Sequence, residues 1–312
     1  MRVAAIDIGT NTVLLLVAER DPSGQLVAVE EHAKITRLGE GVDKTRTLAP
    51  AAIERTNAAI DSYAETVRRL GVTRVDVVGT SAMRDAGGGD AVRDHVRSKL
   101  GVDARTISGD EEARLTFSGA LSGIPAEGQR AFRVFDIGGG STEVVHGFHG
   151  SGISPGGDPV LFAQSYDVGS VRLTERHVES DPPTDAEMKA VRDSARAAFA
   201  SVPAFASDLP PVGIAGTMTT LAAVSLQMAT YDGARVHGMT MPASEIERVV
   251  AELARVPLAK RSALPGLEPK RADVIIAGGL VALSYLEHVG ASEVMISDRG
   301  VRWGLAEALA TT

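Results

Sequence analysis

A short pattern that occurs twice constrains the fold more than any other feature of this sequence. An apolar strand ends in Asp7-Ile8-Gly9, a turn of small polar residues follows, and the chain returns as a second apolar strand. The same order recurs at Asp136-Ile137-Gly138, followed by a Gly-Gly-Ser turn. The two copies lie about one domain length apart. The repeat predicts two α/β halves of similar construction, with a ligand in the cleft that they flank.

Strand and helix patterns alternate along the rest of the chain, as expected of an α/β protein. Two Ser/Thr-x-x-Glu capping boxes, Ser108 to Glu111 and Thr184 to Glu187, predict helix starts. We predict strands over residues 2–8, 13–19, 25–32, 74–80, 102–107, 131–137, 142–147, 212–215 and 293–297. We predict helices over residues 51–70, 90–100, 108–122, 184–205, 217–227, 244–255, 271–289 and 299–309.

Composition excludes several classes of function. The chain has no cysteine, which excludes disulfides, thiolate nucleophiles and cysteine-ligated zinc. Its net charge is −8, so no global basic field favours binding to DNA or to a membrane. The first residues lack the pattern of a signal peptide, and the longest apolar stretch, 274–286, is too short to span a bilayer. We therefore expect a cytoplasmic protein.

The two turns are candidate phosphate sites. Turns rich in Gly, Ser and Thr direct backbone N–H groups and hydroxyls at one point, which suits an anion. The candidates are Gly9, Thr10, Asn11 and Thr12 in the first copy, and Gly138, Gly139, Gly140, Ser141 and Thr142 in the second. One copy alone would favour an ordinary tight hairpin. Two copies at domain spacing favour a pair of phosphate-binding turns.

Acidic residues beside these turns are candidate metal ligands. A hairpin brings Asp136 and Glu143 to one end of the strand pair, and Asp7 holds the corresponding place in the first copy. Paired carboxylates beside a phosphate site favour a divalent cation, because two bare anions would repel the substrate. We expect Mg²⁺ or a similar ion.

Glu111 and Glu112 are predicted to have different roles. If Ser108 is the N-cap, Glu111 falls at the third helical position, where it can bond back to the cap. Glu112 lies beside the apolar stripe of the same helix. It could project toward the phosphate turns and take a proton from an attacking water, or it could be a solvated acid at a helix end.

Two further segments are candidate anion sites. Arg84, which follows a buried strand and the residues Thr80-Ser81, is either a phosphate clamp or a plain loop arginine. Gly216-Thr217 joins a strand to a helix N-terminus, which is either an anion site or a hydroxyl-capped helix.

Taken together, these motifs resemble the Ppx/GppA family of exopolyphosphatases and guanosine pentaphosphate phosphohydrolases. The resemblance runs nearly end to end and depends on a set of motifs in a fixed order. They are Asp7 to Thr12, Arg37 to Val42, Thr80 to Ala86, Ser108 to Leu115, Asp136 to Glu143, Gly169 to Glu175, Gly216 to Thr220, Arg271 to Asp273 and Ser297 to Gly300.

The resemblance implies two ribonuclease-H-like domains of the actin, Hsp70 and sugar kinase superfamily, flanking an active-site cleft. It implies domains at residues 1–123 and 124–298, with the helix at about 299–312 packed on the first. By the same resemblance, Glu112 is the general base, Asp136, Gly138 and Glu143 form the magnesium and phosphate site, and Asp7 with its turn forms the other phosphate loop. We also expect Asp7 to be a metal ligand, and Ser81 and Arg84 to bind phosphate.

The expected activity is removal of the terminal phosphate of inorganic polyphosphate by metal-assisted attack of water. Hydrolysis of guanosine pentaphosphate is the alternative within the family, and phosphotransfer of the sugar or acetate kinase type is the alternative from another class. By comparison with longer family members, we expect a short two-domain form without their helical C-terminal region, which helps to bind long polyphosphate. Relatives commonly pair, so we expect a homodimer.

Overall fold

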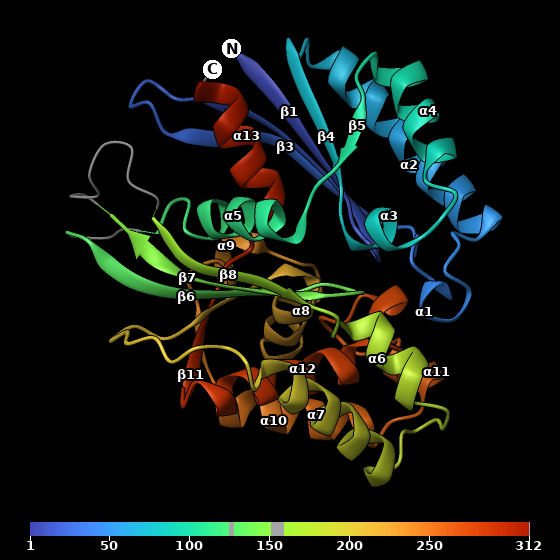
Figure 1. Ribbon diagram of the computed structural model, residues 1–312, viewed down its shortest axis with the longest axis vertical. Coiled ribbons are helices and arrows are strands. Elements are labelled where there is room, and N and C mark those ends of the chain that lie inside the picture. Colours follow the sequence, from blue (N-terminus) through green and yellow to red (C-terminus); the bar gives the residue numbers. More distant parts are fainter. Residues whose placement is uncertain (125–127, 151–158, 312) are drawn as a thin grey trace. The chain divides into compact units, whose positions relative to one another are not determined.

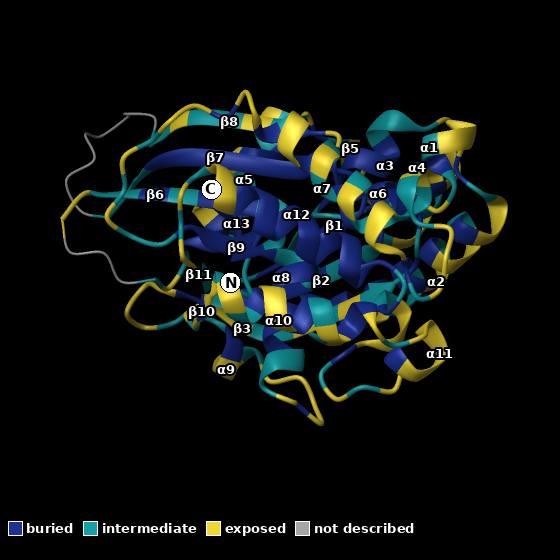
Figure 2. Ribbon diagram, turned by 90° about the horizontal axis from the view of Figure 1, so that it is seen from below, coloured by how far each residue is buried: buried dark blue, intermediate teal, exposed yellow. Residues whose placement is uncertain are grey.

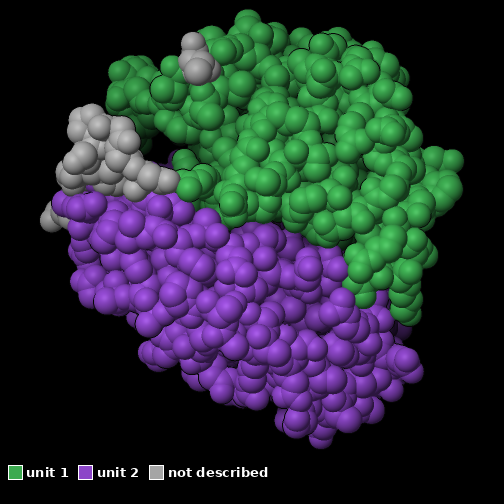
Figure 3. Space-filling model, viewed as in Figure 1, with its two compact units in different colours: residues 1–119, 301–312 green, residues 120–300 purple. Residues whose placement is uncertain are grey.

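The computed structural model describes residues 1–124, 128–150 and 159–311. The chain forms two compact units, unit 1 (residues 1–119 and 301–312) and unit 2 (residues 120–300), coloured separately in Figure 3. Each unit contains one β-sheet with helices packed on it, so the predicted α/β fold class is confirmed. Among the described residues, no helix combines the length and hydropathy needed to cross a bilayer.

Unit 1 has a five-stranded sheet in the order β3-β2-β1-β4-β5. Strand β1 (Arg2–Ile8) pairs antiparallel with β2 (Thr12–Arg20), which pairs antiparallel with β3 (Leu26–Ile35). On its other side β1 is parallel to β4 (Arg74–Gly79), and β4 is parallel to β5 (Ala104–Thr106). The carboxyl ends of three strands therefore meet at one edge of this sheet.

Helices cover both faces of the unit 1 sheet, as Figure 1 shows. Successive side chains of a strand point to opposite faces. Ile6 and Leu15 pack with α2 (Pro50–Arg69) and α4 (Asp90–Leu100), whereas Val3 and Leu16 pack with α13 (Val301–Thr311). The remaining helices are α1 (Val42–Thr45), α3 (Ser81–Asp85) and α5 (Gly109–Ala120), the last of which begins in unit 1.

Unit 2 has a six-stranded sheet in the order β10-β11-β9-β6-β7-β8. Strands β6, β9 and β11 are parallel, and β7 and β8 extend the sheet antiparallel. The strands are β6 (Arg130–Ile137), β7 (Thr142–His149), β8 (Val160–Tyr166), β9 (Val212–Ile214), β10 (Thr240–Pro242) and β11 (Glu293–Ile296). The hairpin β6-β7 thus repeats the hairpin β1-β2 of unit 1.

The core of unit 2 is built around α12 (Ile275–His288), whose residues from Ile275 to Leu286 are all buried. Figure 2 shows this helix in dark blue. Around it pack α6 (Ser170–His177), α7 (Asp185–Phe199), α8 (Ala215–Ser225) and α10 (Ala243–Ala254). The short elements are α9 (Gly233–Val236), α11 (Leu258–Arg261) and the 3₁₀ turn η1 (Pro269–Arg271).

Two helix boundaries differ from the predicted ones by more than two residues. The helix predicted over residues 184–205 ends at Phe199, because Pro203 disfavours helical backbone just before it. The helix predicted over residues 271–289 begins at Ile275, after η1 and a turn. The capping box of α7 is confirmed, since Thr184 and Glu187 each bond the other's backbone N–H.

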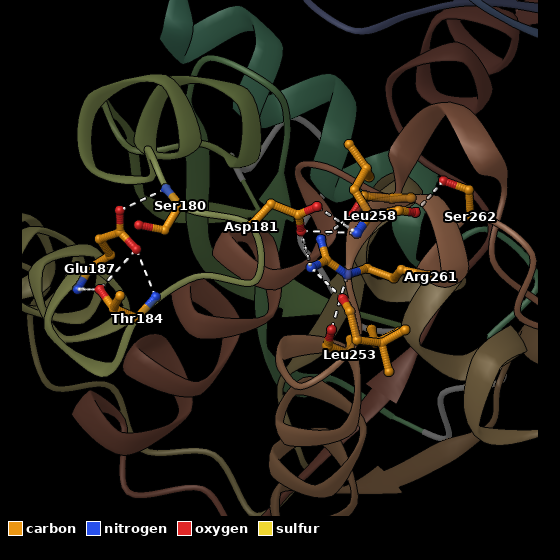
Figure 4. A network of polar contacts seen from close by, with 10 residues as sticks. Ser180, Asp181, Thr184, Glu187, Leu253, Leu258, Arg261 and Ser262 are labelled. Atoms are coloured by element: carbon orange, nitrogen blue, oxygen red, sulfur yellow. Dashed lines mark hydrogen bonds and ion pairs between the residues drawn. The ribbon is translucent and has the colours of Figure 1, made fainter.

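A buried arginine joins several segments of unit 2, as Figure 4 shows. Arg261 donates hydrogen bonds to the carbonyls of Leu253, Val256 and Ala272 at 2.8–3.0 Å. It also faces Asp181, whose carboxylate accepts the backbone N–H of Leu258. One side chain thereby satisfies carbonyls at the end of α10 and at the start of the segment that leads into α12.

Candidate functional site

The carboxyl edge of the unit 1 sheet brings three chain segments together. The backbone N–H of Thr80 bonds the carbonyl of Ile8, and that of Ile107 bonds the carbonyl of Gly79. The parallel pairing of β1, β4 and β5 therefore continues to the last residue of each strand. As a result, the turn after β1, the start of α3 and the approach to α5 all lie at this edge.

The turn after β1 offers several unused hydrogen-bonding groups. Gly9 donates its N–H to the carbonyl of Thr12 at 3.0 Å, which closes the turn. Within the described part of the chain, the backbone N–H groups of Thr10 and Asn11 have no acceptor. The hydroxyl of Thr10 and the side-chain amide of Asn11 are also buried there without a partner. Unpaired buried polar groups are costly, so this turn is suited to a polar ligand.

A later segment supports this turn from behind. The N–H groups of Thr36 and Arg37 bond the carbonyl of Asn11, and the N–H of Gly39 bonds the carbonyl of Thr10. Gly39 lies so close that a Cβ there would be 2.3 Å from Thr10 Cγ2. In the sequence, the motif Arg37 to Val42 indicated only a family resemblance. In the structure, Arg37 and Gly39 of this motif support the turn after β1.

Glu112 is buried and paired with Arg84. The side chain of Glu112 is 8% exposed, and its Oε2 accepts a hydrogen bond from Arg84 Nη1 at 2.9 Å. The same Nη1 lies 3.2 Å from the carbonyl oxygen of Ile107, and Arg84 Nε lies 3.6 Å from Asp85. Ser81, the other predicted phosphate ligand of this segment, donates its hydroxyl to Asp85. The structure thus places Ser81, Arg84 and Glu112 in one polar group.

Glu111 lies on the other side of the same helix turn. Its side chain is 43% exposed and pairs with Arg105, which also contacts Asp76. Ser108 caps the helix by accepting the N–H of Glu111 at 3.2 Å. The predicted return bond from Glu111 to the cap is wrong for the described structure, because Arg105 takes the carboxylate instead. The two neighbouring acids therefore have different surroundings, since Glu112 is buried and Glu111 is exposed.

The turn after β6 has the same construction as the turn after β1. Gly138 donates its N–H to the carbonyl of Ser141 at 3.0 Å, which matches the bond from Gly9 to Thr12. Among the described residues, the N–H groups of Gly139 and Gly140 have no acceptor. Each unit therefore has a turn with two adjacent unpaired backbone donors.

Asp136 and Glu143 stand directly opposite each other in the β6-β7 pair, so their side chains are neighbours on one face. Glu143 is buried, and its Oε1 accepts the hydroxyl of Ser165 at 2.6 Å. In unit 1 the residue opposite Asp7 is Leu14, so the paired carboxylates belong to the second hairpin.

No group of three or more His, Asp or Glu side chains in the described residues is arranged to hold a metal ion. Mg²⁺ usually binds through one or two carboxylates, substrate phosphates and water. The donor set of Asp136 and Glu143 therefore fits Mg²⁺ bound together with a phosphate.

The segment that enters α6 supports the second turn. The N–H of Ser170 bonds the carbonyl of Gly138, and Arg172 donates from its backbone to Gly139 and from Nε to Gly140 at 2.5 Å. Gly169 touches the turn so closely that a Cβ would lie 2.5 Å from the carbonyl oxygen of Gly139. From the sequence alone, Gly169, Ser170 and Arg172 had no assigned role. The glycine before the helix was nevertheless a signal that two backbone segments approach closely there.

The third predicted anion site lies at the start of α8. The hydroxyl of Thr217 donates to the carbonyl of Ile137, so it braces the end of β6. Ala215 has a positive φ of 65°, a conformation that L-residues rarely adopt. A Cβ on Gly216 would lie 2.0 Å from Nη1 of Arg271, so the guanidinium of Arg271 packs directly on this junction. Sequence reasoning missed this contact.

Comparison with known proteins gives consistent matches. The model of the Ppx/GppA phosphatase family matches residues 16–311. Exopolyphosphatase 2 of Mycobacterium tuberculosis is 38% identical, with 99% of this chain and 98% of that protein aligned. Among solved structures, an exopolyphosphatase-like protein has a TM-score of 0.90 at 31% identity, covering 100% of this chain and 99% of that one. The Aquifex aeolicus PPX-GPPA enzyme has a TM-score of 0.81 at 32% identity, with the same shares covered.

Proposed function

Because the chain belongs to the Ppx/GppA phosphatase family, we propose that it is an exopolyphosphatase. It would remove the terminal phosphate of inorganic polyphosphate by attack of water on the terminal phosphorus. The name and similarity of the mycobacterial exopolyphosphatase, aligned over nearly its whole length, support this substrate. The structural observation that carries the proposal is the pair of equivalent turns, each with two adjacent N–H donors that have no acceptor among the described residues.

The residues have distinct proposed roles in this reaction. In unit 1, the turn from Gly9 to Thr12 binds phosphate oxygens, and Glu112 accepts the proton of the attacking water. In unit 2, the turn from Gly138 to Thr142 binds phosphate oxygens through its N–H groups. The bond from water oxygen to phosphorus forms as the anhydride bond breaks, and the shortened chain leaves as its phosphate anion.

We propose that Asp136 and Glu143 hold a divalent cation, with Mg²⁺ as the first candidate. Such an ion supplies positive charge against the oxygens of the transferring phosphoryl group. Asp7, the acid at the corresponding corner of the first hairpin, remains a proposed ligand. We further propose that units 1 and 2 are the two ribonuclease-H-like domains, and that the enzyme acts in the cytoplasm.

The test is steady-state release of phosphate from polyphosphate and from guanosine pentaphosphate, without any acceptor. We expect a higher kcat/KM for polyphosphate, and a large preference for the nucleotide would reverse the assignment. No release without an acceptor would favour a phosphotransferase.

The matched variants are Glu112→Gln and Glu111→Gln. Glu112→Gln should lower kcat by about 10²–10⁴, the usual range for loss of general acid–base catalysis. Glu111→Gln should stay close to the wild type, because its carboxylate pairs with Arg105 at an exposed position. A normal Glu112→Gln enzyme beside an inactive Glu111→Gln enzyme would refute the assignment of the base.

A further inference from the structure

Arg84 is bound to the segment that carries the proposed base. Its Nη1 lies 2.9 Å from Glu112 Oε2 and 3.2 Å from the carbonyl oxygen of Ile107, at the approach to α5. Two acceptors on one nitrogen fix the direction of the guanidinium toward α5. This arrangement links α3, which follows β4, to the helix that follows β5.

Carboxylates face the charge of Arg84 from two directions. Glu112 lies on one side, and Asp85 lies 3.6 Å from Nε on the other. Asp85 is itself held by the hydroxyl of Ser81 at 3.2 Å. A clamp that binds a phosphate gains most from positive charge that protein carboxylates do not already offset. The two neighbouring carboxylates therefore favour a role of Arg84 in positioning Glu112 over a role in binding phosphate directly.

Glu112 in turn depends on a cation. Its side chain is only 8% exposed, and burial disfavours the ionised form of a carboxyl group unless a charge and a hydrogen bond compensate. The guanidinium of Arg84 supplies both at Oε2. Only the ionised carboxylate can accept a proton from water, and only a carboxylate held in one orientation can do so at a fixed point.

We propose that Arg84 is a positioning residue, which keeps Glu112 ionised and oriented, and that its contribution to turnover passes through Glu112. The inference rests on the proposed function, in which Glu112 is the general base. It differs from the sequence expectation, in which Arg84 binds the substrate directly.

The first test is the response of kcat and KM to Arg84→Gln and Arg84→Lys, with polyphosphate as substrate. We expect Arg84→Gln to lower kcat by about 10–100-fold, with KM changed less than about threefold. Arg84→Lys keeps the charge and should recover part of the lost kcat. Arg105→Gln is the matched control, because it removes the corresponding arginine from Glu111. Thermal melts of all three variants check that the fold is intact.

The second test is a double-mutant cycle with Glu112→Gln. If Arg84 acts through Glu112, adding Arg84→Gln to Glu112→Gln should lower kcat by less than about threefold more. A full additional loss, or a rise in KM with unchanged kcat, would refute the inference and make Arg84 a substrate-binding residue. A Glu112→Gln enzyme with normal turnover would refute the proposed base and this inference together, whereas the other two outcomes refute the inference alone.

Discussion

Replacement of Gly169 by alanine tests whether the turn after β6 depends on the segment behind it. A Cβ at position 169 would lie 2.5 Å from the carbonyl oxygen of Gly139, and 2.7 Å from the carbonyl carbons of Gly139 and Gly140. Ordinary contacts between such atoms are roughly 1 Å longer, so the turn or the segment must move by about that amount. Because the contacting atoms are backbone, no side-chain rotation can relieve the overlap.

The expected cost follows from this geometry. Overpacking of this kind typically destabilises a protein by about 1–3 kcal/mol. A displacement of about 1 Å in a substrate-positioning element can lower activity by about 100-fold. We therefore expect Gly169→Ala to lower the melting temperature moderately and to lower kcat/KM strongly at temperatures where the protein stays folded.

Thermal melts and phosphate release measure the two effects separately. Gly87→Ala is the control, because its nearest neighbour would be 3.9 Å from the added Cβ and the position has no positive φ. Wild-type stability and wild-type kcat/KM in Gly169→Ala would refute the argument that this contact sets the position of the turn.

Four further outcomes are expected. His146 packs against Phe162 and Phe205, and burial lowers its pKa to about 4. Because the unfolded chain takes up this proton near pH 6.5, the free energy of unfolding should fall by up to about 3 kcal/mol as the pH drops from 6.5 to 4. Urea titrations should show this loss in the wild type and not in His146→Phe. Gly304→Ala places a Cβ 2.2 Å from the carbonyl oxygen of Leu115, so calorimetry should show a loss of about 1–3 kcal/mol. Arg261→Leu leaves three carbonyls without their donor, and denaturant unfolding should show a loss of about 3 kcal/mol or more. Light scattering at micromolar concentration should give twice the mass of the chain, and a monomeric mass would contradict the expected homodimer.

The repeat of Asp-Ile-Gly corners carried most of the information about the fold. Apolar alternation and the glycine turns are local signals, so both hairpins could be placed from the sequence. The pairing of Asp136 with Glu143 followed from the same local reasoning, because residues at equal distances from a tight turn face each other.

Contacts between distant segments could not be predicted in this way. Arg84 and Glu112 belong to different helices that follow neighbouring parallel strands, and only the strand order brings them together. The capping pattern of Ser108 was a sound local signal, but it could not show that Arg105 competes for Glu111. Likewise, the packing of Arg271 on Gly216 depends on the position of η1 against α8.

Unit 1 is formed from two separate parts of the chain, and this has a consequence for biosynthesis. Helix α13 covers the sheet face formed by residues such as Val3, Ala5 and Leu16, and its Trp303 is buried there. During translation this helix emerges after the whole of unit 2, whose residues are contiguous. Unit 2 can therefore complete its core on the ribosome while the unit 1 sheet still has an uncovered apolar face. Nascent unit 1 therefore exposes apolar surface, which favours aggregation, until its last helix arrives, and a ribosome stalled before Val301 would hold it in that state.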